Sequence, residues 1–499
     1  MEVMFSKSEY TFLQTLTAQT KSQELTQELR IPDSMPDIGR SLNCWGQVVV
    51  RGKEWKNGGI SVSGGIMIWC LYSPEDGTEL RCADTWIPFQ CTWDFPESSR
   101  DGAVYVTGSL KSLDARCISA RKLMIRAVLD LYGEALEPQY TAVNMLRDVP
   151  DGIELLRCTY PLEVPEEAGE KAFQMEDVLS LPAGKPAIHK IVCARIALDL
   201  SEQRVMTNKL VFRGTAKLNI KYLDESSNIC SCEWKQPFSQ LADLDRDYGT
   251  EASAWIMPIV TGQDLELMDD GQLQYKIGVA AQYIIYDRKM LDVIEDAYCV
   301  DCDVDLATEE IMLPVRLDVY HGQMETQNVW NKSGAQVIEV DALQNIPDIH
   351  TNDGNITLEL NGQLQILYMD ENDMLQVALP KTECEIPIMS DAENHMRLRL
   401  DPGDGPRMDA FVSGEQFSHN IHVEAEILKQ QKFTTVVGIN IGETKRSKGD
   451  RPSIILKRGG EQRLWDIAKH CNSTVQAIKD ANGLTDETVT DRLLLIPVK

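Results

Sequence analysis

The sequence predicts a mainly β protein in which three tandem, β-rich, sandwich-like repeats precede a small module with the element order β-α-α-β. Three observations lead to this prediction. A long motif recurs 150 residues further along the chain, polar and apolar residues alternate within each copy as in half-buried strands, and the composition changes near Gly442. A chain of 499 residues has room for three or four domains of about 100–200 residues each.

The recurring motif reads aliphatic-Pro-x-x-x-Pro-x-Ile-x-basic-x-aliphatic at residues 31–42 and again at residues 181–192. In each copy a glycine follows the second proline by 28 residues and a tyrosine follows it by 36. These residues are Gly64 and Tyr72 in the first copy and Gly214 and Tyr222 in the second. Two equal long spacings indicate an internal duplication.

A third, diverged copy follows, because residues 357–370 parallel residues 209–224. It lacks the double proline, and its Gly362 stands two residues nearer to Tyr368. After the tyrosine, each copy has a proline followed by an apolar residue: Pro88-Phe89, Pro237-Phe238 and Pro387-Ile388. We expect the repeats to span residues 1–140, 141–305 and 306–442.

Strand patterns recur within the copies. Residues 216–222 and 363–368 alternate between small or apolar and polar side chains. Clusters of turn-forming residues follow them at 224–228 and 370–373, and an equivalent cluster lies at 73–77. The runs 116–128 and 274–284 are compatible with a further strand near the end of each copy. Each repeat is therefore predicted to be a small β sandwich.

The chain changes character after Gly442. Residues 443–452 are polar, basic and without apolar periodicity, which predicts a linker. From Glu443 to the end the net charge is +3, which leaves −31 for the first 442 residues. The last module, residues 453–499, is thus electrostatically unlike the body and can dock on it or face another partner.

The last module has a clear pattern of elements. Strand-like residues 453–457 precede a helical stretch, 464–471, with apolar residues at i, i+3, i+4 and i+7. Either Ser473 or Thr474 can cap the second helix, 475–481, and Gly483 can supply its left-handed C-cap. Residues 493–497 form the closing strand.

This module resembles the LysM family in residues 464–468, 474–484 and 494–497. The resemblance implies recognition of glycans that contain N-acetylglucosamine, through the loops before the first helix and after the second. The implied binding residues are Gly460, Glu461, Gln462, Arg463, Trp465, Asn482, Gly483 and Leu484. Arg463 replaces the small hydroxyl residue of the family and can bind a partner's carboxylate or remain a solvated charge. For Trp465, a place in the helix core is favoured over a sugar-stacking role.

The upstream repeats resemble the SPOCS domain of spore-coat proteins. Tandem SPOCS domains followed by one LysM module is the layout of the SipL and SpoVID family of coat morphogenetic proteins in endospore-forming Firmicutes. The resemblance implies a protein of the mother-cell cytoplasm that works at the forespore surface. It also implies that the LysM end engages a coat-basement protein such as a SpoIVA-like ATPase, or a wall precursor.

Charge and hydropathy restrict the partners further. With 77 acidic and 49 basic residues, the chain is a poor candidate for nucleic-acid binding or for docking on an anionic membrane. No apolar run approaches the roughly 20 residues of a transmembrane helix, and the N-terminus does not read as a signal peptide. Thirteen cysteines without such a signal predict reduced thiols in the cytoplasm.

The cysteines include two close pairs in the second repeat. Cys230 with Cys232, and Cys299 with Cys302, can together offer four thiolates to a zinc ion. The other repeats lack these pairs and the spacing is not that of a standard zinc motif, so buried free thiols are favoured. The sequence has no phosphate-binding loop, His-Glu-x-x-His or Gly-x-Ser-x-Gly motif. No cofactor and no catalytic residue are predicted.

The sequence therefore predicts a non-enzymatic scaffold in spore-coat assembly, whose LysM module docks on another protein while several weak contacts add up by effective concentration. Unpaired strand edges in the repeats offer a route to self-association. The first alternative is a protein that binds peptidoglycan or a lipid-linked precursor glycan. The second is a cell-wall enzyme targeted by its LysM module.

Overall fold

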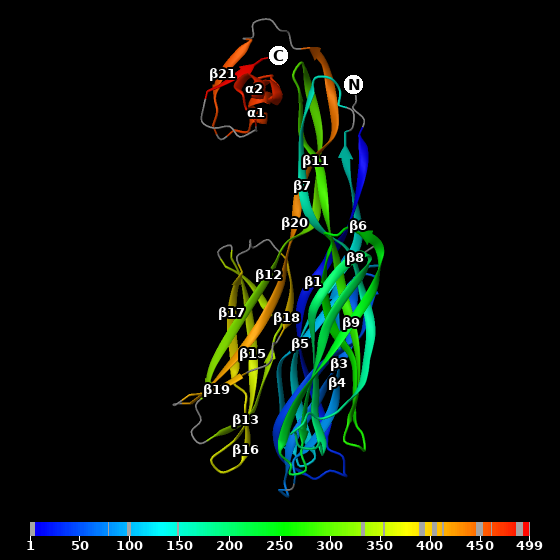
Figure 1. The fold of residues 1–499 in the computed structure, drawn as a ribbon, viewed down its shortest axis with the longest axis vertical. Coiled ribbons are helices and arrows are strands. Elements are labelled where there is room, and N and C mark those ends of the chain that lie inside the picture. Colours follow the sequence, from blue (N-terminus) through cyan, green and yellow to red (C-terminus); the bar gives the residue numbers. More distant parts are fainter. Residues whose placement is uncertain are drawn as a thin grey trace.

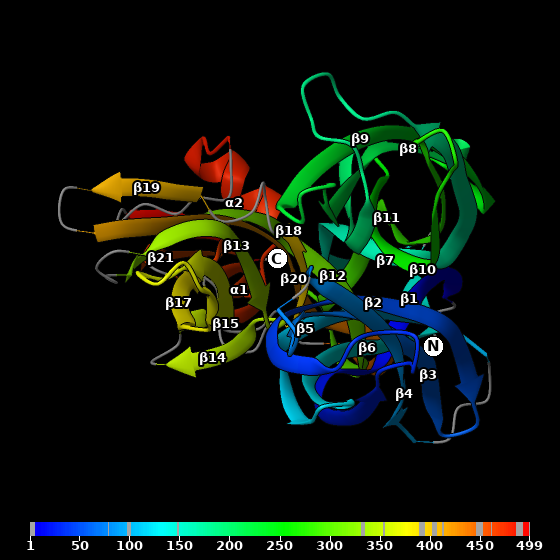
Figure 2. The same ribbon diagram turned by 90° about the horizontal axis from the view of Figure 1, so that it is seen from below.

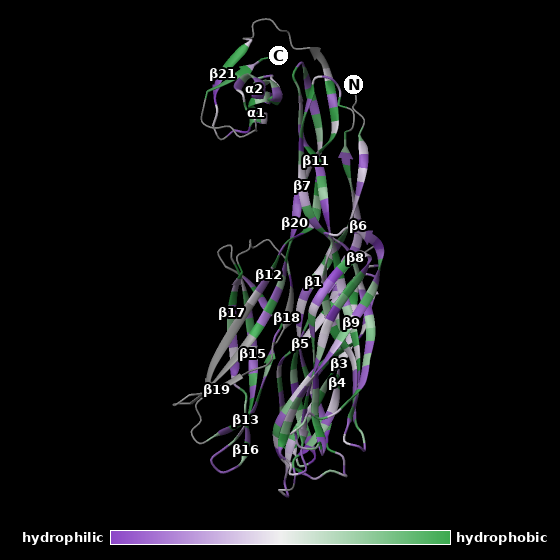
Figure 3. Cartoon of the chain, viewed as in Figure 1, coloured by the Kyte–Doolittle hydropathy of each residue, from purple (hydrophilic) through white to green (hydrophobic). Residues whose placement is uncertain are grey.

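The computed structural model is mainly β, as predicted, with two short helices near the C-terminus of the described chain (Figure 1). It describes residues 5–498 except 78, 97–100, 147–148, 331–334, 353–354, 389–394, 402–406, 412–413, 446–452, 461 and 486–492. Along many strands hydrophilic and hydrophobic residues alternate, which gives the banded appearance of Figure 3.

The first unit is a sandwich of two antiparallel sheets, with strand orders β1-β6-β5 and β2-β3-β4. Its strands are β1 (Ser6–Arg30), β2 (Ile38–Lys56), β3 (Gly59–Pro74), β4 (Arg81–Asp94), β5 (Ala103–Ser119) and β6 (Lys122–Met145). Apolar side chains from both sheets, among them Ile66, Phe89 and Leu129, share one core. The run 116–128, expected as one strand, is a hairpin because β5 and β6 pair on either side of Ala120-Arg121.

The second unit pairs a sheet of order β10-β11-β7 with a sheet made of β8 and β9. Its strands are β7 (Ile153–Leu179), β8 (Lys190–Leu223), β9 (Ile229–Tyr248), β10 (Ser253–Leu267) and β11 (Leu273–Cys299). Strand β8 doubles back near Thr207, which has a φ of 49°. The Ser201 hydroxyl accordingly lies 3.4 Å from the Arg213 carbonyl oxygen. Strand β8 thus takes the place that β2 and β3 share in the first unit.

The third unit repeats this plan with shorter pieces. Its sheets have the orders β12-β20-β18, with β19 also on β20, and β13-β15-β14, with β16 and β17 also on β15. Its strands are β12 (Cys302–Trp330), β13 (Gln336–Gln344), β14 (Asp348–Asn352), β15 (Asn355–Met369), β16 (Leu375–Ala378), β17 (Lys381–Ile388), β18 (His395–Asp401), β19 (Arg407–Phe411) and β20 (Gly414–Lys445).

The three units surround a common centre when the molecule is seen from below (Figure 2). In each unit the first strand pairs antiparallel with the last. These long strand pairs continue beyond the sandwiches as a stalk (Figure 1). Side chains of all three strand pairs, such as Val143, Leu291 and Phe433, form the core of the stalk. The expected boundaries at 140, 305 and 442 fall inside β6, β12 and β20, because these strands extend into the stalk.

The residues of the sequence motif have specific structural tasks. The Tyr72 hydroxyl donates a hydrogen bond to the Pro36 carbonyl oxygen at 3.2 Å, and Tyr222 does the same to Pro186 at 3.0 Å. This explains why the tyrosine follows the second proline by 36 residues in both copies. The glycine sits where strands approach closely, because a Cβ atom on Gly64 would lie 2.2 Å from the Val49 carbonyl oxygen.

The last module has the expected element order: β21 (Ile454–Arg458), α1 (Leu464–His470), α2 (Val475–Asn482) and β22 (Leu493–Pro497). The two strands pair antiparallel and form a ribbon. The helices bury Leu464, Ile467 and Ile478 against it. Residues 446–452, most of the expected linker, lie outside the described residues, whereas β20 runs to Lys445.

Candidate functional site

The C-terminal module contains the residues that the sequence singled out for binding. The side chain of Thr474, rather than that of Ser473, caps α2 by accepting a hydrogen bond from the Ala477 amide at 3.1 Å. The Ser473 hydroxyl instead donates to the Pro497 carbonyl oxygen. Gly483 has a φ of 60° and ends α2 in the left-handed conformation, as expected. The two capping residues thus fix the loops on either side of α2.

Trp465 belongs to the core of the module and also contacts the body. Its side chain is only 4% exposed, and its ring meets that of Tyr298 edge-on, with 4.8 Å between the centroids. The indole N–H donates to Asp296 at 2.8 Å, and the Lys469 ammonium lies 2.7 Å from the same carboxylate. The module is therefore seated on the end of β11, and the structure places Trp465 in a packing role rather than on an open surface.

Asn482 also has a structural role. Its amide nitrogen donates to the carbonyl oxygens of Ile478, at 2.8 Å, and Leu495, at 2.6 Å. Its side-chain oxygen accepts from the Leu495 amide at 2.8 Å. This side chain connects the end of α2 to β22, and these bonds occupy both its amide nitrogen and its oxygen. Leu484 is partly buried against the module core.

The remaining predicted residues lie on the surface. Arg463 precedes α1, is 64% exposed in its side chain and pairs with Asp466 at 3.2 Å. This ion pair raises the pKa of the Arg463 guanidinium. Gly460, Gln462 and Gly483 are exposed, and Glu461 lies outside the described residues. The structure therefore divides the predicted set between packing residues and exposed loop residues.

The outer face of the ribbon carries an exposed aliphatic surface that was not predicted from the sequence. Ile454 is 52% exposed, and Leu456 and Leu493 are each 62% exposed. Residues 454 and 456 are two apart on one strand and share a face, while Leu494 and Ile496 are buried on the opposite face. We call Ile454, Leu456 and Leu493 the ribbon face. The continuous apolar runs of the strands concealed it, because their period does not separate an outer face from an inner one.

The zinc hypothesis for the four cysteines is wrong for this geometry. Cys232 packs near Leu273 at the start of β11, whereas Cys299 ends that strand and forms a disulfide with Cys302. A strand of this length separates the two pairs by roughly 80 Å. The expectation that all cysteines are reduced is also wrong for Cys299 and Cys302. The described residues hold no group of three or more histidine, cysteine or acidic side chains placed to bind a metal.

Buried charges connect the three units. Trp45 lies opposite Trp69, three residues before Tyr72, and Asp341 occupies the corresponding place opposite Gln365 in the third unit. The Trp45 indole N–H donates to Asp341 at 2.8 Å, and Arg195, the equivalent residue of the second unit, pairs with the other carboxylate oxygen. Three equivalent positions, occupied by three different residue types, thus meet at the centre of the molecule.

Lys221 joins this cluster 2.5 Å from Asp341 and also pairs with Glu339. Burial by itself raises the pKa of Asp341, but the charges of Arg195 and Lys221 outweigh burial and hold that pKa below its ordinary value. The pKa of Glu339 is raised, chiefly by burial. The cluster therefore keeps Asp341 ionised and compensated inside the protein.

A second buried cluster is centred on Arg397. Arg397 donates to Glu134 of the first unit at 2.6 and 2.8 Å, and to Glu426 of its own unit at 2.6 Å. Tyr286 of the second unit donates to Glu426 at 2.9 Å. Arg316 lies 2.9 Å from Glu426 as well. All three units contribute to this network, so it holds them together rather than offering free catalytic groups.

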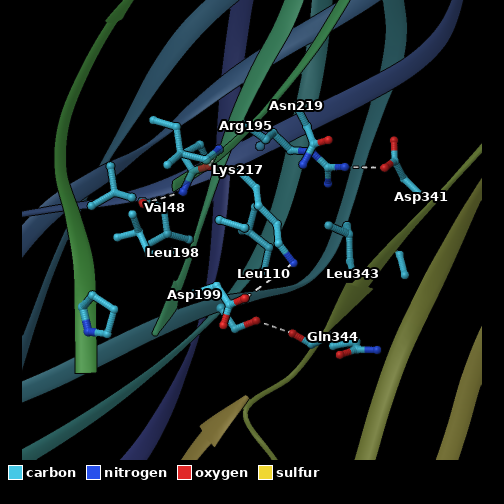
Figure 4. Close-up of a pocket in the computed structure, with 18 of the residues that line it drawn as sticks. Val48, Leu110, Arg195, Leu198, Asp199, Lys217, Asn219, Asp341, Leu343 and Gln344 are labelled. Carbon is cyan, nitrogen blue, oxygen red and sulfur yellow. Dashed lines mark hydrogen bonds and ion pairs between the residues drawn. The ribbon is translucent and has the colours of Figure 1, made fainter. Parts of the chain in front are cut away.

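A cavity of about 1020 Å³ lies between the units, next to the Asp341 cluster (Figure 4). Its walls combine aliphatic side chains such as Leu110, Leu198 and Leu343 with charged ones. Those charges are largely compensated in place, as with Lys217 and Asp199, whose charged atoms are 3.8 Å apart. The balance of charge on the walls selects no class of ligand.

Neither helix in the described part of the chain has the length and apolar character that crossing a membrane requires. Comparison of the chain with protein-family models, with curated proteins and with solved structures finds no match.

Proposed function

We propose that the protein is a non-enzymatic scaffold of spore-envelope assembly whose C-terminal module, of LysM type, docks on a coat-basement protein such as a SpoIVA-like ATPase. The three β units, which we interpret as SPOCS-type repeats, carry that module. The order of the units resembles the layout of SipL and SpoVID, and it supports a place at the forespore surface in the mother-cell cytoplasm.

The observation that carries the docking proposal is the ribbon face. Three large aliphatic side chains, Ile454, Leu456 and Leu493, are each more than half exposed on one side of a module of fewer than fifty residues. Exposed apolar patches commonly mark protein interaction sites. Burying each of these side chains in a complex gains about 1.5–3 kcal/mol. A protein partner with an apolar groove matches this chemistry.

The alternative, glycan binding, receives less support from the same module. Trp465 is the only aromatic residue among Phe, Tyr and Trp after residue 453, and it is 4% exposed against the body. Sugar rings commonly stack on exposed aromatic faces, and this ring is not open to one. Asn482, a polar candidate, already bonds Ile478 and Leu495. The exposed Arg463 suits a carboxylate of a protein partner better than a neutral sugar.

The body supports the scaffold by fixing the position of the module. The charged clusters around Asp341 and Arg397 join all three units. Trp465 attaches the module to Asp296 and Tyr298 of β11, so the outer faces of the units and the module keep a defined relation. Contacts made at several of these surfaces then add up by effective concentration. A partner that reaches two of them binds more tightly than either contact alone allows.

The experiment measures binding of the full chain to a SpoIVA-like ATPase from an endospore-forming Firmicute, by biolayer interferometry. We expect the double variant Leu456→Glu, Leu493→Glu to lose at least about tenfold in affinity, because charges replace buried aliphatic groups. The matched control is Met290→Glu with Met312→Glu, two body residues that are 55% and 54% exposed, and it should bind like the wild type.

A second arm measures binding of the same proteins to chitin oligomers. Tight binding of the wild-type chain to chitin oligomers, with no binding to the ATPase, would overturn the proposal in favour of a glycan sensor. Equal ATPase binding by the ribbon-face variant and its control would show that docking uses another surface.

A further inference from the structure

A second cavity, of about 550 Å³, lies between the first and second units. Its floor is the outer face of the β2-β3-β4 sheet, including Met67 and Trp86. Its opposite wall comes from the start of β8 and the last third of β10, including Gln263 and Leu265. Pro32, in the motif loop of the first repeat, also lines the cavity. We call this cavity the inter-unit groove; neither the C-terminal module nor the ribbon face contributes to it.

Arg51 and Trp86 form the first feature of the groove. The Arg51 guanidinium lies over the Trp86 ring, with 4.1 Å between its carbon and the ring centroid. On β3, Gly65 leaves room for the ring, since a Cβ atom there would lie 2.2 Å from it. The ring thus packs against the sheet and the guanidinium. This arrangement makes Trp86 a support that orients Arg51 rather than a platform for a sugar.

A second arginine, Arg30, also lines the groove. Arg30 lies directly opposite Lys122 in the β1–β6 ladder, an unfavourable pairing of like charges. Lys122 pairs with Glu28 at 2.6 Å. Within the described residues, neither Arg30 nor Arg51 forms an ion pair with a carboxylate. Two arginines without an acidic partner are unusual in a body that carries a net charge of −31.

Other charged groups line the groove as well. The Lys190 ammonium lies 3.4 Å from the Cys82 carbonyl oxygen, and the carboxylates of Asp84 and Asp264 are also on the wall. Three cations against two carboxylates leave a small positive excess. An anionic group that enters between Arg30 and Arg51 therefore finds uncommitted partners, and the two carboxylates set where along the groove it can lie.

Gly262 and Gln263 belong to the wall that β10 contributes to the groove. The Gln263 side-chain nitrogen donates to the Ala194 carbonyl oxygen at 3.3 Å, while the Gln263 side-chain oxygen is buried and has no hydrogen-bond partner among the described residues. Because this oxygen is closed to solvent, it is not a contact for a bound peptide. Next to it, a Cβ atom on Gly262 would have no other atom within 4 Å, so the groove is open at this point.

We propose that the inter-unit groove binds an extended, acidic peptide segment of a partner protein. Its carboxylates pair with Arg30 and Arg51, and an intervening apolar side chain packs on Met67 and Leu265. This is a second interaction surface on the body. It is independent of the proposed docking of the C-terminal module, because the two share no residue.

The test uses the full chain and a fluorescein-labelled peptide, Glu-Leu-Glu-Leu-Glu, with binding followed by fluorescence anisotropy. We expect saturable binding that weakens as salt rises and that falls at least about tenfold in the Arg51→Glu variant, because like charges then oppose each other. The matched control is Arg116→Glu, at a side chain that is 79% exposed and outside the groove.

A second pair of variants tests whether the peptide binds in the groove, without changing the charge of the protein. Gly262→Phe fills open space in the groove and should abolish binding, whereas Gly249→Phe fills open space elsewhere and should not. Thermal unfolding confirms that each variant is folded. Equal binding of the neutral peptide Gln-Leu-Gln-Leu-Gln, undiminished binding in Gly262→Phe, or preference for chitin oligomers over the acidic peptide would each overturn the proposal.

Discussion

The ring of Trp465 meets the ring of Tyr298 edge-on, with 4.8 Å between their centroids. This contact joins residues that are 167 positions apart in the chain. It is reinforced by the Tyr298 hydroxyl, which donates to the Ser473 carbonyl oxygen at 2.8 Å. The C-terminal module is therefore held in a defined place on the body.

Replacing Tyr298 with alanine should release the module from its seat. An edge-to-face aromatic pair contributes about 0.5–1.5 kcal/mol beyond its burial, and the hydrogen bond about another 1 kcal/mol. We expect faster hydrogen exchange in α1 and faster protease cleavage between the body and the module. Tyr298→Phe removes only the hydroxyl and should show a smaller effect. Identical hydrogen exchange of α1 in the wild type and in Tyr298→Ala would show that Tyr298 does not hold the module on the body.

Replacing Arg397 with alanine should destabilise the whole body. The substitution leaves the buried carboxylates of Glu134 and Glu426 without this cation, and breaking a buried ion pair from one side costs about 3–5 kcal/mol. The measurement is the free energy of unfolding in urea, with Arg116→Ala as the exposed control. A decrease of less than about 1 kcal/mol in the free energy of unfolding would show that Arg397 does not compensate the buried charges of Glu134 and Glu426.

The stability of the body should depend on the ionisation of Asp341. Because its pKa is lowered in the folded state by Arg195 and Lys221, its contribution is complete above the unfolded pKa of about 3.9 and is lost as the pH falls towards the folded value. The raised pKa of Glu339 acts in the opposite sense.

Asp341→Asn is therefore the informative variant, since it removes one group and leaves the other acids in place. Urea unfolding between pH 6 and pH 3 should show a shallower loss of stability in this variant than in the wild type. Parallel curves for the two proteins would contradict the role of Asp341.

The motif glycine should not tolerate a side chain. A Cβ atom on Gly64 would lie 2.2 Å from the Val49 carbonyl oxygen, and one on Gly214 would lie 2.2 Å from that of Asp199. We expect Gly64→Ala and Gly214→Ala each to lower the free energy of unfolding by about 1–3 kcal/mol through overpacking. Gly249→Ala, which meets open space, should be neutral in the same thermal and urea unfolding experiments.

Local features of the fold could be predicted because their causes are close in sequence or repeated along it. Thr474 caps the start of α2 and Gly483 caps its end, and both residues were among the capping residues expected from the sequence. Strand alternation predicted the β class. The spacing between Pro36 and Tyr72 pointed to a repeated feature, although only the structure gave its cause, a hydrogen bond between them.

The candidate site was less predictable. Trp465 was favoured as a core residue, and it is one. Its contact with Tyr298 was not predicted, because the two residues are 167 positions apart in the chain and such a contact leaves no periodic pattern in the sequence. The ribbon face was missed because apolar residues occupy both sides of the strand around Leu493, so alternation could not identify the outer side. Reduced thiols were expected at Cys299 and Cys302, but the two residues form a disulfide. That expectation came from the cell compartment and not from the distance between the two cysteines.

The sequence by itself determined the β class, the element order of the C-terminal module and where the chain repeats its motif, because propensity, alternation and capping act over a few residues. Only the tertiary structure decided how the repeats meet. Trp45, Arg195 and Asp341 occupy equivalent positions but differ in type, and they become a hydrogen-bonded and ionic cluster only after three separate units close around one centre. Such a contact depends on packing between distant segments, which no local pattern encodes.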